Sequence, residues 1–554
     1  MIAATQCGEL SSTLDELLLG EFGNPATSSQ ARISFSLSLL RDIVRAGGNS
    51  WVRDSRLYVA WPDWSGVQGR DFARQALVAA KDLRPLTIRE RERVAPLFAP
   101  DLDGESLSSV LREGRFRLIS AATRHPSGIS YQDAFAAALR YWTMPYRGRS
   151  GRMKRFVLTA EHHLLGEHSV VAGILELGDE APFCTWRDDL LGISPSSFVR
   201  WLAGKDISAI RQSAERLRNF RHCLRGTGGG QELAYEDAAA IVARREVIEQ
   251  AAHGRSRVLK EQHDALKDRK RLAYGLRLAR GEFALREIAL GKRKLDSQDA
   301  DLGAGVRGLH DMLLPRLHLE ATVCGAVPPF SHALGGKLLV SFLSHPSVID
   351  ATMDCEGALL DWSFDSDRLK DLLPSKGMLC LTTKGLYAEH AAIYNRGDVP
   401  GLLRSIRMVH LDNTSGTTTT LISAQTHQYA KQMLHDDDSS AMRVSDVYGS
   451  GGAKRHRVIE KATIDVGLPA RLAMAGIRRP VYGLNYVSNA PAVSWLGEEP
   501  CWLVDRQESI DEFSERATDL WRQRWLSRAI DRIADFALVP SLIRTLEAQS
   551  LEAA

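Results

Sequence analysis

The stretch LLPRLHLEATVCGAVPPFSHALGGKLLVSFLSHP, Leu313–Pro346, decides the fold that the sequence predicts. Its first part, Leu313–Ala326, alternates apolar residues as a buried strand does. Pro328-Pro329 ends that strand, and Gly335-Gly336-Lys337 opens a new apolar helix. A strand, a glycine loop and a helix N-terminus in this order are typical of phosphate-binding sites. The stretch therefore predicts an α/β core with either a plain tight turn here or a site for a pyrophosphate-bearing cofactor such as coenzyme A.

The same loop excludes one large class of enzyme. A P-loop needs glycine where Ser331 stands and serine or threonine where Leu338 stands. An ATPase of the P-loop kind is therefore not expected, and coenzyme A stays the cofactor to test.

Further strands are predicted on both sides of this stretch. Arg155–Ala160, Val170–Leu177 and Met378–Thr383 are rich in β-branched and apolar residues. The loop Lys384–Arg396 follows the last of these strands, and loops at strand ends commonly carry function. Its candidate catalytic residues are Tyr394, His390 and Asn395. Such side chains can transfer protons or hydrogen-bond a nucleobase, and they can equally brace the loop.

Charge is unevenly distributed along the 554 residues. The whole chain has 71 Lys and Arg against 68 Asp and Glu, a net charge of +3. The segment Arg244–Lys294 alone has 15 basic and 7 acidic residues, a local +8, so the remainder sums to −5. Its helical period predicts either a salt-bridged helical hairpin or a basic arm laid on nucleic-acid phosphates, with Arg269, Lys270 and Arg271 as contacts. A glycine-bearing linker, Gln298–Gly308, is expected to follow.

A second glycine loop, YGSGGAKRHR, spans Tyr448–Arg457 and precedes a predicted helix. Its glycines permit close backbone approach, and its basic side chains can pair with phosphates. The expected nucleic-acid contacts in it are Ser450, Gly451, Lys454, Arg455 and Arg457.

The N-terminal part reads as mixed α/β. A helix, Ile33–Ala46, is followed by a glycine turn and a basic hairpin, Ser50–Pro62. This is the order of elements in a winged helix, and other small domains share it.

Neither metal nor membrane is predicted. The segment EHHLLGEH, Glu161–His168, is rich in potential ligands, but it lacks the H-E-x-x-H spacing and is flanked by strands. The seven cysteines show no C-x-x-C pair, which favours free thiols in a reducing, cytoplasmic protein. No run of 18 apolar residues occurs, so no transmembrane helix is expected.

Four segments resemble the DruA family of the Druantia anti-phage defence systems of bacteria. They are Arg187-Asp188-Asp189-Leu190-Leu191-Gly192, the stretch LGGKLLVSFLSHP, the stretch TTKGLYAEHAAIYNR and the turn Thr414-Ser415-Gly416. In that family the same features occur in the same order, and here they span about residues 150–420.

The resemblance implies a fold and a domain layout. The family domain is similar to acyltransferases of the GNAT kind, with a mixed sheet and a cofactor loop between a central strand and a helix. The expected segments are an N-terminal mixed domain (1–145), the first part of the DruA-like core (146–205), a basic helical insertion (206–308), the second part of the core (309–505) and C-terminal helices (506–554).

Three functions stay open at this point. The first is a cytoplasmic anti-phage defence protein that engages foreign nucleic acid. The second is an acyltransferase that modifies a nucleobase or amine, with coenzyme A at Gly336 and Lys337 and Tyr394 as general acid. The third is an accessory subunit of a defence complex or mobile element that acts through protein contacts alone.

Overall fold

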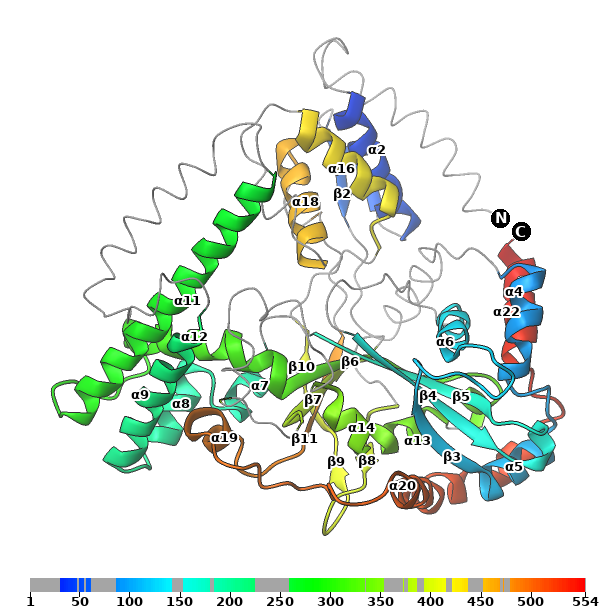
Figure 1. The fold of residues 1–554 in the computed structure, drawn as a ribbon. Coiled ribbons are helices and arrows are strands. Elements are labelled where there is room, and N and C mark those ends of the chain that lie inside the picture. Colours follow the sequence, from blue (N-terminus) through cyan, green and yellow to red (C-terminus); the bar gives the residue numbers. More distant parts are fainter. Residues whose placement is uncertain are drawn as a thin grey trace.

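A mixed α/β fold is built around a seven-stranded sheet, as predicted (Figure 1). The computed structural model describes residues 30–46, 49–53, 56–60, 86–141, 153–179, 184–224, 259–333, 335–352, 372, 377–385, 393–414, 421–436, 452–468, 472 and 479–553. No helix within these ranges is both long and apolar enough to cross a membrane.

The strands of the sheet run in the order β10-β11-β7-β6-β5-β4-β3. They are β3 (Arg115–Ser120), β4 (Met153–Glu161), β5 (Val170–Gly178), β6 (His318–Ala326), β7 (Cys380–Lys384), β10 (Val409–Asn413) and β11 (Pro480–Asn485). Neighbouring strands are antiparallel except β6 and β7, which are parallel. The strands predicted at Arg155–Ala160, Val170–Leu177 and Met378–Thr383 are confirmed within two residues.

Helices cover both faces of the sheet because its strands carry apolar side chains on both sides. Phe156 and Leu175 belong to one core with Leu339 and Trp521, whereas their neighbours Val157 and Ile174 belong to a second core with Phe135. The helices of the first core include α5 (Gly104–Glu113), α13 (Gly335–Ser341) and α20 (Ile510–Arg524). Those of the second are α4 (Ile88–Val94), α6 (Tyr131–Leu139) and α22 (Leu542–Ala553).

The helical segment predicted from residue 206 begins as expected with α9, but it ends differently from the prediction. The helices of this region are α7 (Thr185–Leu190), α8 (Pro195–Leu202), α9 (Ile207–His222), α11 (Leu259–Ala289) and α12 (Ala300–Leu317). The linker predicted at Gln298–Gly308 is wrong, because α12 runs through it. Asp299 caps this helix by accepting hydrogen bonds from the backbone N–H groups of Asp301 and Leu302. The strand predicted from Leu313 consequently begins only at His318.

The boundary expected at residue 145 does not separate packing units. Strand β3 is the edge strand of the central sheet, so residues 86–141 pack with the core. The earlier elements α2 (Gln30–Arg45), β1 (Asn49–Arg53) and β2 (Arg56–Ala60) instead pack with α16 (Ala424–Asp436) and α18 (Gly452–Asp465). The predicted N-terminal helix and hairpin are confirmed, but their partners lie almost 400 residues further along the chain.

Smaller elements complete the described part. They are β8 (Asp398–Val399), β9 (Ile406–Arg407), α14 (Pro346–Ile349), α19 (Ala490–Leu496) and α21 (Ile530–Ala534). The helical C-terminus expected from residue 506 is present, and Ser509 caps its first helix, α20, in a reciprocal pair with Glu512.

Candidate functional site

The parallel strands β6 and β7 pair over only part of their length. Their register runs from His318 opposite Cys380 to Ala321 opposite Thr383, and β6 then continues to Ala326 paired with β5 alone. A β-bulge in β6 coincides with the point of separation, since Glu176 faces Val323 while the next residue of β5 faces Ala321. Bulges of this kind are common beside functional sites because they redirect the strand and its side chains.

Side chains replace backbone partners at the separation. Thr383 donates its hydroxyl to the carbonyl oxygen of Ala321 at 2.9 Å. Tyr394, which is only 5% exposed, donates its hydroxyl to the carbonyl oxygen of Cys324 at 3.4 Å. The predicted residue Tyr394 therefore lies in the middle of the sheet, between the diverging strands.

Burial decides the protonation of this site. It raises the pKa of Tyr394 well above its ordinary value, so the phenol keeps its proton near neutral pH and is suited to act as a general acid rather than as a phenolate base. Burial also raises the pKa of the Cys324 thiol to about 12. Cys324 is consequently a thiol rather than a thiolate and is not an activated nucleophile.

The predicted cofactor loop contacts the predicted catalytic loop. Lys337 donates to the carbonyl oxygens of Asn395 at 2.7 Å and Ile393 at 3.3 Å, and its Nζ lies 4.0 Å from the ring centroid of Trp525. Burial and then the charges of Arg524 and Arg396 lower the pKa of Lys337 to about 8. Lys337 thus fixes the segment that carries Tyr394.

Packing accounts for both glycines of the cofactor loop. A Cβ atom at Gly336 would lie 2.5 Å from Cδ1 of Ile393, and one at Gly335 would lie 2.6 Å from the carbonyl oxygen of Phe330. Gly335 is required because the obstructing atom is backbone, whereas at Gly336 the obstructing atoms belong to the side chain of Ile393. Cofactor binding by Gly335, Gly336 and Lys337 stays a prediction, and the contacts give these residues a structural role.

The face of the sheet opposite Tyr394 has buried charged residues at the paired ends of β6 and β7. Glu320 forms an ion pair with Lys384 at 3.2 Å, and both side chains are largely buried. The imidazole of His318 lies 3.0 Å from the hydroxyl of Thr382. Burial and then the charges of Arg187 and Lys384 lower the pKa of His318, which keeps it neutral.

A chain of ion pairs extends from this place into the helices. Arg187 is completely buried and pairs with Asp188 at 2.7 Å. His310 lies 3.4 Å from Asp188 and 3.1 Å from Asp311, which pairs in turn with Arg277 at 2.7 Å. The motif residues Arg187 and Asp188 therefore link α7 to α12 beside the sheet.

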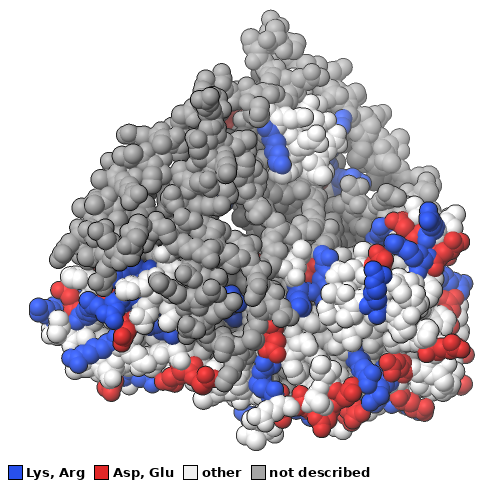
Figure 2. Space-filling model, in the orientation of Figure 1, with Lys and Arg blue, Asp and Glu red and all other residues white. Residues whose placement is uncertain are grey.

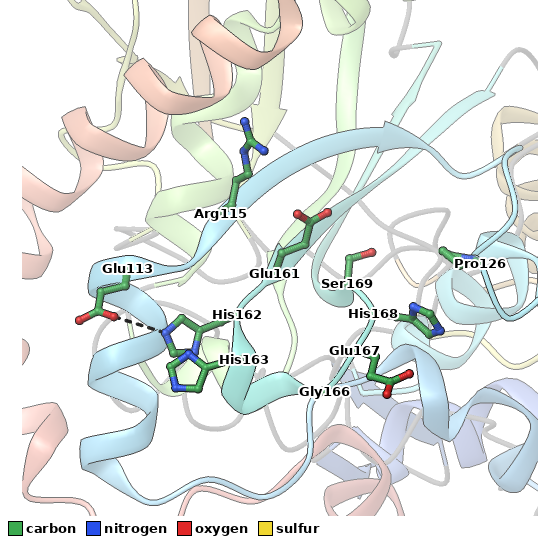
Figure 3. Close-up of a pocket in the computed structure, with 10 residues that line it drawn as sticks. All are labelled: Glu113, Arg115, Pro126, Glu161, His162, His163, Gly166, Glu167, His168 and Ser169. Carbon is green, nitrogen blue, oxygen red and sulfur yellow. Dashed lines mark ion pairs between the residues drawn. The ribbon is translucent and has the colours of Figure 1, made fainter.

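Histidines line an open pocket beside the connection between β4 and β5, near the edge strand β3 (Figure 3). Its lining is Glu113, Arg115, Pro126, Glu161, His162, His163, Gly166, Glu167, His168 and Ser169. Nε2 of His162 lies 3.7 Å from Glu113, while His168 lies on the opposite side of the pocket. No group of His, Cys, Asp or Glu in the described ranges is arranged to hold a metal ion.

The remaining predicted residues lie partly outside the described residues. His390, Ser450 and Gly451 fall outside them. Arg269, Lys270 and Arg271 belong to α11, and Lys454 and Arg455 to α18, but only their backbone is described. Arg457 is exposed on α18. The predicted loop Tyr448–Arg457 is therefore wrong from Gly452 on, because α18 begins there.

The sequence alone did not single out His318, Glu320 or Thr383. The available signal was polar residues at every second position of a strand that is otherwise apolar, as in His318-Leu319-Glu320. Such residues are buried in an internal strand and need partners there.

Comparisons of the chain with protein-family models, with curated proteins and with solved structures find no match. Function is therefore inferred from the residues and their geometry.

Proposed function

We propose that this chain is a DruA-like protein of bacterial anti-phage defence that engages foreign nucleic acid. The observation that carries the proposal is that the described residues of the four DruA-like segments lie around β6 and β7, with Thr414 alone described in the fourth. The charge of Arg187 lowers the pKa of His318 at the start of β6. Lys337 donates a hydrogen bond to the carbonyl oxygen of Asn395. Thr414 accepts a hydrogen bond from the backbone N–H of Arg479, whose guanidinium donates to Gly385 at the end of β7. Segments separated by more than 200 residues thus form one structural centre.

The architecture of this centre supports a GNAT-like core. The sheet is mixed, and the loop 327–334 joins the central strand β6 to helix α13. A mixed sheet with a helix after its central strand is compatible with the GNAT-like core that we propose, while fold likeness by itself does not define an activity. Other subunits of a defence system are the protein partners that we propose.

Several arginines of the basic segment form ion pairs within the protein. Arg277 pairs with Asp311 at 2.7 Å and Arg280 with Asp301 at 2.6 Å. Arg293 contacts Asp299 and Asp301 as well. Since these arginines are engaged within the protein, we expect phosphates to be contacted by two groups of basic residues. They are Arg269, Lys270 and Arg271 of α11 and Lys454, Arg455 and Arg457 in the first turns of α18.

DNA binding that weakens steeply with salt is the expected result of a test. Each phosphate that the protein neutralises releases counterions, so the slope of log affinity against log salt should be about −0.9 per contact. The variant Lys454→Glu/Arg455→Glu/Arg457→Glu should lose two to three phosphate contacts. The slope of log affinity against log salt should then become less negative by roughly 2 to 3. Fluorescence anisotropy with a labelled duplex between low and physiological salt measures it.

A matched control carries the same charge change at exposed positions away from the glycine loop, Lys205→Glu/Arg211→Glu/Arg404→Glu. Its slope should equal that of the unmodified protein. Absent or salt-insensitive binding by the unmodified protein would reject the proposal.

Acyl transfer is a second candidate, and the position of Tyr394 favours it. A protonated phenol between the diverging strands β6 and β7 is suited to act as a general acid. Coenzyme A at 1 mM should then raise the melting temperature, since a ligand present at about 100 times its dissociation constant stabilises by about 2.7 kcal/mol. Adenosine triphosphate at the same concentration is the control, and equal shifts or no shift for coenzyme A count against acyl transfer.

A further inference from the structure

A separate core unites two distant segments of the described sequence. Phe35, Leu39 and Ile43 of α2 form an apolar cluster with Met433 of α16 and Ile459 of α18. Figure 1 shows these three helices and the β1–β2 hairpin together, away from the helices that pack on the sheet. We call α2, β1, β2, α16 and α18 the composite unit.

Polar contacts fix α16 against α2. Asp42 of α2 is buried and accepts hydrogen bonds from the backbone N–H of Ser423 at 2.7 Å and the hydroxyl of Thr426 at 2.6 Å. Ser38 is hydrogen-bonded to the same hydroxyl at 2.7 Å. The N-terminus of α16 is therefore bound to Asp42 of α2, and this contact fixes the orientation of α16 in the unit.

The exposed face of α16 is polar and lacks acids among its described side chains. At 100° per residue, Gln425, Gln428, Lys431 and Gln432 fall on one face about 120° wide, and all four are exposed. The opposite face is buried through residues such as Ala430, Met433 and Leu434. Three amides and an ammonium group therefore point away from the core of the unit.

The exposed charged side chains that are described in the composite unit are positive, like Lys431 on α16. Among its described side chains, the exposed charged ones are Arg41, Arg45, Lys431 and Arg457. Its acids are less accessible, since Asp42 is buried and Glu460 and Asp465 are half-buried. Figure 2 shows Lys or Arg side chains on the visible face of this unit.

We propose that the composite unit is a winged-helix-like module that binds double-stranded DNA with α16 in the major groove. Three helices and an antiparallel hairpin are the elements of a winged helix, here contributed by two distant segments. A helix fits the major groove of B-DNA, which is about 12 Å wide. Gln425, Gln428 and Gln432 can read adenine edges through their amides, and Lys431 can neutralise a phosphate.

The proposal rests on the proposed function and deepens it by naming the element and the partner. Double-stranded RNA has a deep, narrow major groove that does not admit a helix. Duplex DNA should therefore be preferred over duplex RNA of the same sequence, and the preferred DNA should be enriched in A·T pairs where the glutamines read it.

The test uses the full chain, with duplexes first selected from a random library. The variant Gln425→Ala/Gln428→Ala/Lys431→Glu/Gln432→Ala should bind the selected DNA about 1,000-fold more weakly, because it removes three base contacts and each good base contact contributes roughly tenfold. Its alanines favour helix, so the unit should still fold, as circular dichroism would show. The single variant Gln428→Ala should lose about tenfold and change the selected sequence.

The control Arg211→Glu/Arg404→Glu, on α9 and beside β9, should bind like the unmodified protein. If the α16 variants bind selected DNA normally, or if duplex RNA binds equally well, the α16 site is overturned while nucleic-acid binding stands. If the unmodified protein binds no DNA at low salt, the proposed function itself fails.

Discussion

Replacing Gly281 with leucine should detach the helical segment α9–α11–α12 from its native packing. A Cβ atom at Gly281 would lie 2.3 Å from Cα of Gly305 and 2.9 Å from Cδ1 of Leu217. Helices α11 and α12 thus cross with glycine against glycine, and the obstructing atom is backbone, which cannot rotate away. Overpacking of this kind lowers the free energy of unfolding by about 3 kcal/mol or more. This loss exceeds the gain of up to about 1 kcal/mol that comes from the higher helix propensity of leucine.

Hydrogen exchange is the measurement for Gly281→Leu, because a chain with several cores need not unfold in one step. Amides of α9, α11 and α12 should exchange faster, while those of β4 and β5 should keep their protection. Gly303→Ala is the control on the same helix α12, since its Cβ would lie 3.5 Å or more from every neighbour outside the helix backbone. Unchanged protection in Gly281→Leu would contradict the close crossing.

Glycines explain where the sequence misled. Gly303, Gly305 and Gly308 made 298–308 resemble a linker, yet they are helical in α12. Gly305 and Gly308 lie against α11, where a Cβ would come within 2.5 and 3.1 Å of its atoms. Gly335 and Gly336, for which phosphate binding stays a prediction, also allow close packing of the chain. A glycine permits both flexibility and close approach, and only the position of the neighbouring chain distinguishes the two.

Local signals predicted most strands, because their patterns lie within one short segment. Strand β5, buried at all nine positions, reads as a continuous apolar run. The pairing of α2 with α16 depends instead on contacts such as Asp42 with Ser423, which are 381 residues apart. No local pattern encodes such a contact, so the composite unit could not be derived from the sequence.

The candidate site was predictable in part. Tyr394, Asn395 and Lys337 were chosen from two loops, and the structure brings these loops into contact. Their surroundings were not predictable, because the separation of β6 from β7 and the bulge beside Glu176 are properties of the assembled sheet.

Replacing Arg187 with methionine should strongly destabilise the core. Arg187 is completely buried, and its guanidinium is paired with Asp188 at 2.7 Å. Methionine removes the charge while leaving Asp188 largely buried, and breaking a buried pair in this way costs about 3–5 kcal/mol. Chemical unfolding monitored by tryptophan fluorescence should show the loss, whereas Arg211→Met at an exposed position should change stability by less than about 0.5 kcal/mol.

The loss in Arg187→Met should also grow with pH. Burial tends to lower the pKa of His310, but its hydrogen bonds to Asp188 and Asp311 outweigh burial and raise the pKa to about 9. A histidine whose folded pKa is raised stabilises the protein fully below its unfolded pKa of about 6.5 and loses that contribution as pH rises through about 9. Without Arg187, protonated His310 is the cation that remains beside Asp188 among the pairs described. The deficit should therefore be smaller at pH 6 than at pH 9.5, and a deficit independent of pH would show that His310 does not share this network.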